Sequence, residues 1–321
     1  MLKIGGIELD YPVMLAPLSG VSDLPFRLIN RSFGAPLAFT EMIDARALSH
    51  RDKRTRKMLA STVEDRPLGV QLLGAHEKYL MKAIEVLAEG EFDLIDFNAA
   101  CPTPKVIRKG KGAALLKEPR TLHGMLRAIV DASKLPVTVK IRTGWDASSV
   151  NAREVALYAE DAGISALFIH GRTKDQGYSG AVDYRRIREV KDALRIPVIA
   201  SGDNTSTAAI KKMFDETGCD GVLVARGCLG NPWIFRDALS FMQNGSPPVK
   251  PTMDERIATI VRHLDLVIQH HGEERGIGIF HKFFIWYTRG LRGTKPLRDK
   301  AFRTGTKSQI LSVIEELRTL E

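Results

Sequence analysis

Short runs of apolar and β-branched residues recur along most of the chain and alternate with longer amphipathic segments. Runs that are apolar throughout are typical of parallel strands buried on both faces. We expect such strands over Val13–Ala16, Leu37–Thr40, Leu68–Leu72, Leu94–Asn98, Val137–Arg142, Ala166–His170, Val198–Ser201 and Val222–Arg226.

The segments between these runs carry apolar residues at spacings of three and four, which predicts amphipathic helices. The clearest are Tyr79–Ala88, Leu122–Ala132 and Val155–Ala162. Gly163 and Pro197, which are residue types that end helices, stand just before two of the strands. The alternation predicts an α/β fold, and specifically a (β/α)8 TIM barrel.

After the eighth predicted strand the alternation stops. The stretch Gly245–Pro248 is rich in Gly and Pro and predicts a linker. Thr252 can cap a long helix over Glu255–His271, and helical periodicity continues toward the C-terminus, including Gln309–Leu320. We therefore expect a TIM barrel over residues 1–244 and a small C-terminal all-helical domain over residues 245–321.

The composition is that of a globular protein. Of the 321 residues, 44% are hydrophobic and 26% are charged, which is enough to bury a large core. Cys101, Cys219 and Cys228 have neither disulfide nor zinc-ligand spacing, which indicates a reducing compartment and no metal. The chain has no apolar run of membrane-spanning length and no signal-peptide pattern at its start. We expect a cytoplasmic monomer without a membrane or protein partner.

Polar or turn-forming residues stand at the carboxyl end of nearly every predicted strand. In TIM barrels these ends converge on one mouth, where the active site lies. A single Lys or His there is more often structural, but a ring of such residues favours a ligand site. The candidates are Ala16, Pro17, Leu18, Glu41, Gln71, Asn98, Lys140, Arg142, His170, Ser201, Gly202, Asp203, Ala225 and Arg226.

Two glycine-containing turns, Ser201-Gly202-Asp203 and Ala225-Arg226-Gly227, follow the last two strands. This corner of a TIM barrel commonly binds phosphate through backbone N–H groups, and glycine lets the backbone come close. Together with the Arg226 cation, the turns predict a cofactor that carries a phosphate. The chain has no P-loop and no Gly-x-Gly-x-x-Gly on a βαβ unit, which argues against a Rossmann nucleotide site.

Cys101 follows the fourth strand in the sequence Asn98-Ala99-Ala100-Cys101-Pro102. Pro102 disfavours helical backbone at Cys101, which predicts a thiol displayed on an extended loop at the barrel mouth. A free thiol is mostly protonated at neutral pH, so it suits a general acid as well as a nucleophile. We interpret Cys219 and Cys228 as buried, inert residues.

Basic residues gather in three segments, and the net charge is +9. The loop after Cys101 has four cations and no acid, which suits a mobile lid over a polyanion. The segment Arg46–Lys57 has six cations against Asp52 alone. These clusters predict a nucleic-acid partner. The loop and the C-terminal part contribute Lys105, Arg108, Lys109, Lys111, Lys282, Arg289 and Arg292.

Taken together, these motifs resemble the signature of the dihydrouridine synthases, FMN enzymes that reduce uridine in tRNA to dihydrouridine. The matching segments run along nearly the whole chain and look most like the bacterial branch of the family. They are Ala16–Leu18, Gln71, Asn98–Pro102, Lys109–Ala113, Lys140–Arg142, His170–Thr173, Ile199–Asp203, Ala225–Arg226 and Trp286–Tyr287.

The resemblance implies a mechanism. NADPH would reduce FMN, hydride would pass from flavin N5 to C6 of uracil, and Cys101 would protonate C5. Asn98 would orient the pyrimidine and Gln71 would bond the isoalloxazine edge. Lys140 would stabilise negative charge near flavin N1 and O2. The other cofactor-binding residues would be Ala16, Pro17, Leu18, His170, Ser201, Gly202, Asp203, Ala225 and Arg226. Contacts to tRNA would come from Lys105, Arg108, Lys109, Arg142, Arg172, Lys282, Arg289 and Arg292.

Two residues depart from the family pattern. Ala100 stands where the family usually has Gly, which would cost on the order of 1 kcal/mol if that backbone needed a positive φ. Ser201 stands where the family often has Asn, which leaves the detail of one flavin contact open.

Two other functions stay open at this point. An FMN-dependent dehydrogenase or reductase of a free pyrimidine would run similar chemistry, but it has no need of a basic helical domain. A non-catalytic RNA-binding barrel would bind RNA without holding a flavin.

Overall fold

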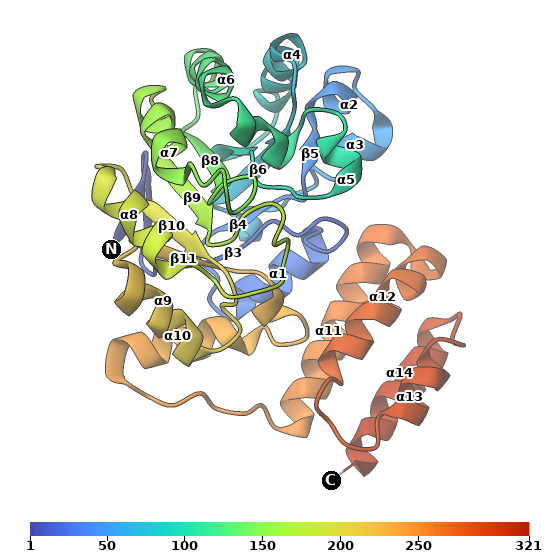
Figure 1. Ribbon diagram of the computed structural model, residues 1–321. Coiled ribbons are helices and arrows are strands. Elements are labelled where there is room, and N and C mark those ends of the chain that lie inside the picture. Colours follow the sequence, from blue (N-terminus) through green and yellow to red (C-terminus); the bar gives the residue numbers. More distant parts are fainter. Residues whose placement is uncertain (321) are drawn as a thin grey trace.

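Residues 1–320 are described by a computed structural model, at whose centre lies a closed parallel barrel (Figure 1). Its strands are β3 (Val13–Leu15), β4 (Ala38–Phe39), β5 (Ile43–Asp44), β6 (Leu68–Leu73), β7 (Leu94–Asn98), β8 (Val137–Arg142), β9 (Ala166–His170), β10 (Val198–Ser201) and β11 (Gly221–Val224). They follow one another in the order β3, β11, β10, β9, β8, β7, β6 and β4, and β5 also pairs with β6. The amide of Leu15 donates to the carbonyl of Leu37 (3.0 Å), which joins the two ends of the sheet.

Each predicted strand coincides with a barrel strand, so the predicted (β/α)8 TIM barrel is confirmed. The apolar pattern missed an N-terminal hairpin of two short antiparallel strands, β1 (Leu2–Ile4) and β2 (Ile7–Leu9). Leu2, Ile4 and Leu9 are buried in the interior of the barrel, so the hairpin closes its amino-terminal end.

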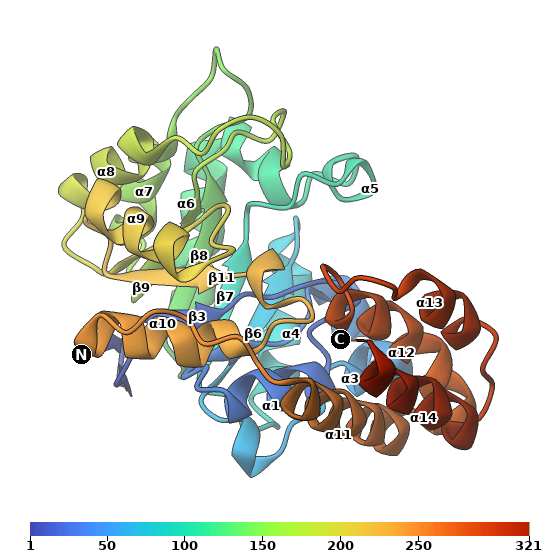
Figure 2. The ribbon, with the colours of Figure 1, turned by 90° about the horizontal axis from the view of Figure 1, so that it is seen from below.

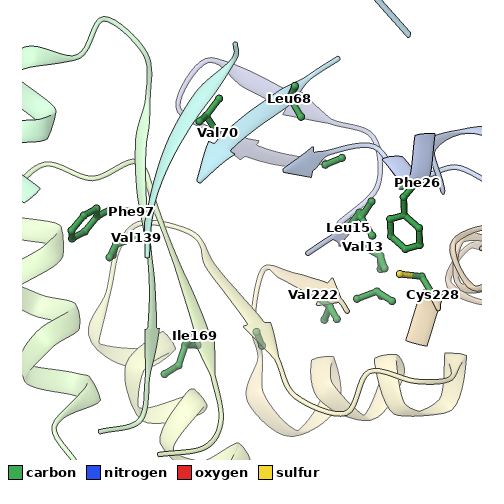
Figure 3. Packing of buried hydrophobic residues seen from close by; sticks show 14 of the residues in the cluster. Val13, Leu15, Phe26, Leu68, Val70, Phe97, Val139, Ile169, Val222 and Cys228 are labelled. Atoms are coloured by element: carbon green, nitrogen blue, oxygen red, sulfur yellow. The ribbon is translucent and has the colours of Figure 1, made fainter. Parts of the chain in front are cut away.

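Side chains alternate along each strand between two cores. Outward-facing residues such as Val13, Val139 and Ile169 belong to the large apolar cluster shared with the surrounding helices (Figure 3). Inward-facing residues such as Met14 and Phe168 fill the lower barrel with a second apolar cluster. The barrel is therefore packed solid at its amino-terminal end and can be hollow only at its mouth.

The inward positions become polar toward the carboxyl ends of the strands. On β7, Leu94 faces the apolar interior, and the two-residue period places Asp96 and Asn98 on the same inward face. On β8 the same alternation turns Thr138 and Lys140 inward while Val139 packs outward. The two-residue alternation of the strands thus brings these polar side chains together at the barrel mouth.

Helices surround the barrel and connect its strands. The three predicted helices are confirmed as α4 (Glu77–Leu87), α6 (Pro119–Ala132) and α7 (Ala152–Asp161). Within residues 1–320, no helix combines the length and apolar character that crossing a bilayer requires. The barrel helices are α1 (Leu24–Ser32), α2 (Ala45–Ser49), α3 (Lys53–Lys57), α4 (Glu77–Leu87), α5 (Pro104–Ile107), α6 (Pro119–Ala132), α7 (Ala152–Asp161), α8 (Tyr184–Ala193), α9 (Thr207–Thr217) and α10 (Trp233–Asn244), with 3-10 turns over Val63–Asp65, Gly112–Lys117 and Arg226–Cys228.

Further helices follow the barrel: α11 (Met253–His271), α12 (Glu273–Tyr287), α13 (Lys295–Ala301) and α14 (Lys307–Glu315). They lie together on one side of the barrel, where α11 packs against α1 (Figure 2). Thr252 caps α11, since its hydroxyl accepts the amide of Glu255 at 3.1 Å. The helix predicted over Gln309–Leu320 is shorter than expected, because α14 ends at Glu315 and a 3-10 turn continues to Thr319.

The C-terminal helices contact the barrel through a backbone-to-backbone approach at Gly230. This residue has a φ of +68°, and a Cβ added to it would fall on the backbone of Trp286 and Tyr287 in α12. His271 also hydrogen-bonds the Asp23 carboxylate at 2.8 Å, at the start of α1. The last barrel loop therefore requires glycine for two independent reasons, conformation and space.

We expect Gly230→Ala to lower the free energy of unfolding by about 2–3 kcal/mol, because it combines overpacking with a left-handed backbone. Urea denaturation measures the change. Gly278→Ala on α12 is the matched control, because a Cβ there meets nothing within 4 Å. That change should stabilise the helix by roughly 0.5–1 kcal/mol. Equal stability of the Gly230 variant and the wild type would contradict the close approach.

Candidate active site

A cavity of about 360 Å³ opens at the carboxyl ends of the barrel strands. This volume lies in the usual range for small-molecule sites. The wall contains Cys101, Asn98, Arg142 and every residue predicted to bind the cofactor. The predicted cofactor-binding residues in the wall are Ala16, Pro17, Leu18, Gln71, Lys140, His170, Ser201, Gly202, Asp203, Ala225 and Arg226. The barrel thus brings residues from many strands around one site.

A chain of buried hydrogen bonds forms the floor of the cavity. Asp96, which is 1% exposed, accepts hydrogen bonds from Gln71 Nε2 (2.7 Å) and Thr138 Oγ1 (2.8 Å). The other end of the Gln71 amide, Oε1, accepts a hydrogen bond from Asn98 Nδ2 (2.8 Å). Strand register sets the two bonds to Asp96, because Gln71 and Thr138 both lie opposite Asp96 on the neighbouring strands. The carboxylate therefore orients both amides.

The backbone of Cys101 is held at both of its polar groups. Its N–H donates to Asn98 Oδ1 (2.9 Å), and its carbonyl accepts the amide of Ala113 (3.1 Å). The thiol lies 3.3 Å from Thr103 Oγ1. The residue is only 7% exposed although it lines the cavity. Cys101 thus lies in a loop at the barrel mouth, where it faces the cavity at low solvent exposure.

Lys140 places a partly buried ammonium group in the cavity wall. Burial lowers the pKa of Lys140 to about 8, against the attraction of the Asp96 carboxylate. Burial likewise raises the pKa of Asp96 to about 6, against the hydrogen bonds from Gln71 and Thr138. Lys140 Nζ donates to Ser201 Oγ at 3.3 Å. Near neutral pH the cavity therefore holds a fixed cation that can stabilise developing negative charge.

His170 is a neutral imidazole in this site. Burial, together with the neighbouring charges of Arg142 and Lys140, lowers its pKa to about 2. Its Nδ1 atom has no hydrogen-bond partner within residues 1–320. Asn204 Oδ1, of another residue that lines the cavity, is also buried and unpartnered in the described chain. Buried polar atoms of this kind favour a ligand that completes their hydrogen bonds.

The turn after β10 has the geometry of an anion site. Gly202 and Asp203 have φ values of 137° and 53°, and the amides of Gly202, Asp203 and Asn204 donate to no backbone acceptor in residues 1–320. Asp203 bridges Arg172 (2.5 Å) and Arg226 (2.7 Å), and the hydrogen bond from Arg172 is the main reason that its pKa is lowered. Arg226 stays 49% exposed and lines the cavity.

Known proteins resemble the chain over nearly its whole length. A family model described as dihydrouridine synthase matches residues 14–319. The chain belongs to the dihydrouridine synthase family. It is 37% identical to tRNA-dihydrouridine synthase B of Pasteurella multocida (strain Pm70), over 97% of this chain and 94% of that protein. It is also 37% identical to a probable tRNA-dihydrouridine synthase of Rickettsia typhi (strain ATCC VR-144 / Wilmington), over 93% of this chain and 91% of that protein.

A solved structure of histamine dehydrogenase from Rhizobium sp. 4-9 shares the fold. It superimposes with a TM-score of 0.58 at 14% identity, and covers 83% of this chain. The match spans only 50% of the dehydrogenase chain. At such low identity the likeness concerns the fold alone.

Both departures from the dihydrouridine synthase pattern have a local explanation. Within residues 1–320 the only non-glycine residues with positive φ are Arg51 and Asp203, so Ala100 carries no conformational strain. Ser201 Oγ donates to the carbonyl of Ile169 (3.1 Å) and accepts from Lys140 Nζ. The serine therefore orients the partly buried cation.

Two of the cations predicted to contact tRNA are corrected. Arg142 is 3% exposed and donates to the carbonyls of Ala100 (2.7 Å), Thr173 (2.9 Å) and Gly177 (2.8 Å). Arg172 is 2% exposed and is held by Asp203 and by backbone carbonyls. Each guanidinium joins the loops around the cavity, so neither residue is an exposed surface cation of the kind that the prediction assumed.

The remaining predicted cations differ in exposure. Lys282 is half-buried and donates to the carbonyl of Gly20, in the loop after β3, so it joins α12 to the cavity rim. The exposed cations are Lys105, Arg108, Lys109, Arg289 and Arg292. That these five residues contact tRNA stays a prediction.

Lys111 differs from the other cations of the cysteine loop, because it is 7% exposed and pairs with Asp44 Oδ2 at 2.5 Å. Burial alone raises the pKa of Asp44, but the hydrogen bond and charge of Lys111 outweigh it and the net pKa is lowered. Next along the chain, Gly112 has a φ of +61°, and a Cβ there would lie 2.7 Å from the carbonyl oxygen of Cys101. Lys111 and Gly112 thus anchor the return of the loop beside the thiol.

Sequence reasoning missed Asp96, Thr138 and Tyr178. The alternation of apolar and polar residues in Leu94–Asn98 and Val137–Arg142 could have identified the first two as inward-facing. Tyr178 is 62% exposed in an irregular loop and lines the cavity, and no sequence period marks it. In the described residues, no group of three or more His, Cys, Asp or Glu is placed to hold a metal ion.

We expect Asp44→Asn to loosen the cysteine loop without losing the cap of α2. Asp44 Oδ1 caps α2 through the amides of Arg46 (3.0 Å) and Ala47 (3.2 Å), and Asn caps equally well. Loss of the ion pair should cost about 1–2 kcal/mol, since Asp44 is partly exposed.

The measurement is the alkylation rate of Cys101 by iodoacetamide, followed by peptide mass spectrometry. The rate should rise several-fold, while the buried Cys219 and Cys228 stay unreactive as internal controls. An unchanged rate at Cys101 would show that Lys111 does not anchor the loop.

Proposed function

We propose that this chain reduces uridine in tRNA to dihydrouridine, with FMN as cofactor, NADPH as reductant and Cys101 as proton donor. The observation that carries the proposal is the position of Cys101, whose thiol lines the same cavity as Lys140 and the Gly202–Asp203 turn. Similarity to proteins named tRNA-dihydrouridine synthase supports the substrate.

The residues of the cavity fit FMN. The amides of residues 202–204 and the Arg226 cation suit a phosphate, and the Lys140 ammonium suits an anionic reduced ring. His170 Nδ1 and Asn204 Oδ1, which lack protein partners in residues 1–320, suit further polar contacts. When bound, FMN supplies the hydride for C6 of the uracil ring, with NADPH as the source of electrons.

Cys101 delivers the proton to C5 of the uracil. Its backbone is fixed by Asn98 and Ala113 before any substrate arrives, so the position of the acid is set in advance. The Asn98 amide is fully used: Nδ2 contacts Gln71 Oε1 and Met42 Sδ (3.2 Å), and Oδ1 accepts two backbone amides. We therefore assign Asn98 to positioning Cys101, in place of the direct pyrimidine contact predicted from the resemblance.

The helices after residue 245 serve in this proposal as the tRNA-binding domain, beside a barrel over residues 1–244. Arg289 and Arg292 are exposed there, and Lys105, Arg108 and Lys109 are exposed on the cysteine loop. Such cations hold phosphates without reading sequence. All the catalytic groups come from one chain, so we propose a monomer that works where tRNA is found, in the cytoplasm.

We expect Cys101→Ala to lower the rate of dihydrouridine formation at least about 100-fold, because a positioned general acid contributes that much. The assay is mass spectrometry of an unmodified tRNA transcript after incubation with the flavin-loaded enzyme and NADPH. Cys219→Ala removes another buried thiol and should retain full activity. Full activity of the Cys101 variant would refute the acid role, and equal turnover of free uridine would favour a free-pyrimidine reductase.

We expect Lys140→Met to lower the midpoint potential of the bound flavin by about 30–60 mV. Removing the cation destabilises the negatively charged reduced form by about 1.4–3 kcal/mol, and 30 mV corresponds to about 1.4 kcal/mol for two electrons. A spectroscopic redox titration measures the potential. Lys140→Arg keeps the charge and should stay near the wild-type value, whereas an unchanged potential in the Met variant would exclude the electrostatic role of Lys140.

A further inference from the structure

An aromatic side chain ringed by basic groups lies on the barrel surface, outside the cavity. The Tyr79 ring, at the start of α4, has Arg46 Cζ 5.4 Å and Lys78 Nζ 5.0 Å from its centroid. The rings of His50 and His76 lie 5.9 and 6.1 Å from the same ring. We call these five residues the Tyr79 cluster.

The cations of this cluster are available to a partner. Arg46 and Lys78 are exposed, and neither has an acidic partner within residues 1–320. Several cations elsewhere on the barrel, by contrast, are paired with acids of the same or a neighbouring element. Such pairs are Arg127–Asp131 (3.2 Å), Arg186–Glu189 (2.7 Å) and Lys191–Asp220 (2.7 Å). The surface field is therefore most positive where cations stand unpaired.

The Tyr79 cluster adjoins the loop that carries Cys101. A Cβ on Gly110 would lie 3.8 Å from Cβ of Ala75, which directly precedes His76. On the other side, Lys111 of the loop pairs with Asp44, two residues before Arg46. In Figure 1, α2 and α4 lie above α5 and α12 lies below it. In this view the cluster and the helical tail thus lie on opposite sides of α5, so a polymer that covers α5 can contact both.

We propose that the Tyr79 cluster is a second RNA contact, with Arg46 and Lys78 on phosphates and Tyr79 against a base or ribose. The inference rests on the proposed function for the identity of the polymer. Cations interleaved with an aromatic face are the combination that binds single-stranded or unstacked nucleic acid. A purely structural cluster has no need of two unpaired exposed cations at the edge of a catalytic loop.

The experiment measures binding of an unmodified tRNA transcript to the flavin-loaded protein over a series of NaCl concentrations. For Arg46→Gln/Lys78→Gln, the slope of log affinity against log salt should fall by about 0.7–0.9 for each lost phosphate contact. Lys212→Gln is the matched control, because Lys212 also lies over a tyrosine ring, 5.2 Å from the Tyr184 centroid, but on the opposite flank. Its slope should equal that of the wild type.

A second variant separates stacking from charge. Tyr79→Ala should weaken binding roughly five- to hundredfold with an unchanged salt slope, and Tyr79→Phe should restore the affinity. The flavin absorbance and thermal midpoint of each variant report whether the barrel is intact.

Equal slopes for the double variant and the wild type would overturn the proposal, as would an equal loss of slope in Lys212→Gln. Binding of the double variant to phosphatidylserine vesicles is measured as well. If that binding is lost while the salt slope for RNA is unchanged, the proposal is also overturned. If the wild type binds the transcript without forming dihydrouridine, the proposed function fails, but the slopes still decide the role of the cluster.

Discussion

The carboxylate of Asp96, buried in the barrel, is the group on which the geometry of the site depends. It fixes Gln71, which fixes Asn98, which in turn holds the backbone of Cys101. It also faces the partly buried ammonium of Lys140, and an unpaired cation in that position would be costly. One negative charge therefore helps to fix the position of Cys101 and favours the charged form of Lys140.

Basic residues perform two distinct tasks in this fold. Arg142 and Arg172 are buried, and their guanidinium groups join loops by donating to backbone carbonyls. Planar groups with several donors suit that task because one side chain satisfies several acceptors. The exposed cations on α5 and around Tyr79 have no such duty and are left for a polyanion. Net charge alone does not separate these two classes.

The loops around the cavity are held by hydrogen bonds and ion pairs to other parts of the same chain. The cysteine loop is anchored at Ala113 and Lys111, the Gly202–Asp203 turn is anchored by Arg172, and the rim at Gly20 is bonded by Lys282 from α12. This arrangement keeps the Cys101 side chain at low solvent exposure although it lines the cavity. The helical tail contributes directly to this arrangement, because Lys282 connects it to the cavity rim.

The sequence by itself determined the barrel, the order of its strands along the chain and many of the residues in the cavity wall, although it missed Tyr178. Apolar runs mark buried strands, and the closure of a parallel barrel forces their carboxyl ends together, so Gln71, Lys140 and His170 could be grouped without coordinates. The tertiary structure decided what each polar group does. Whether Arg142 meets RNA or carbonyls, and whether Lys111 is free or paired with Asp44, depends on loop packing between residues far apart in sequence. Local patterns carry no record of such contacts, because burial and hydrogen bonding are set by partners that only folding supplies.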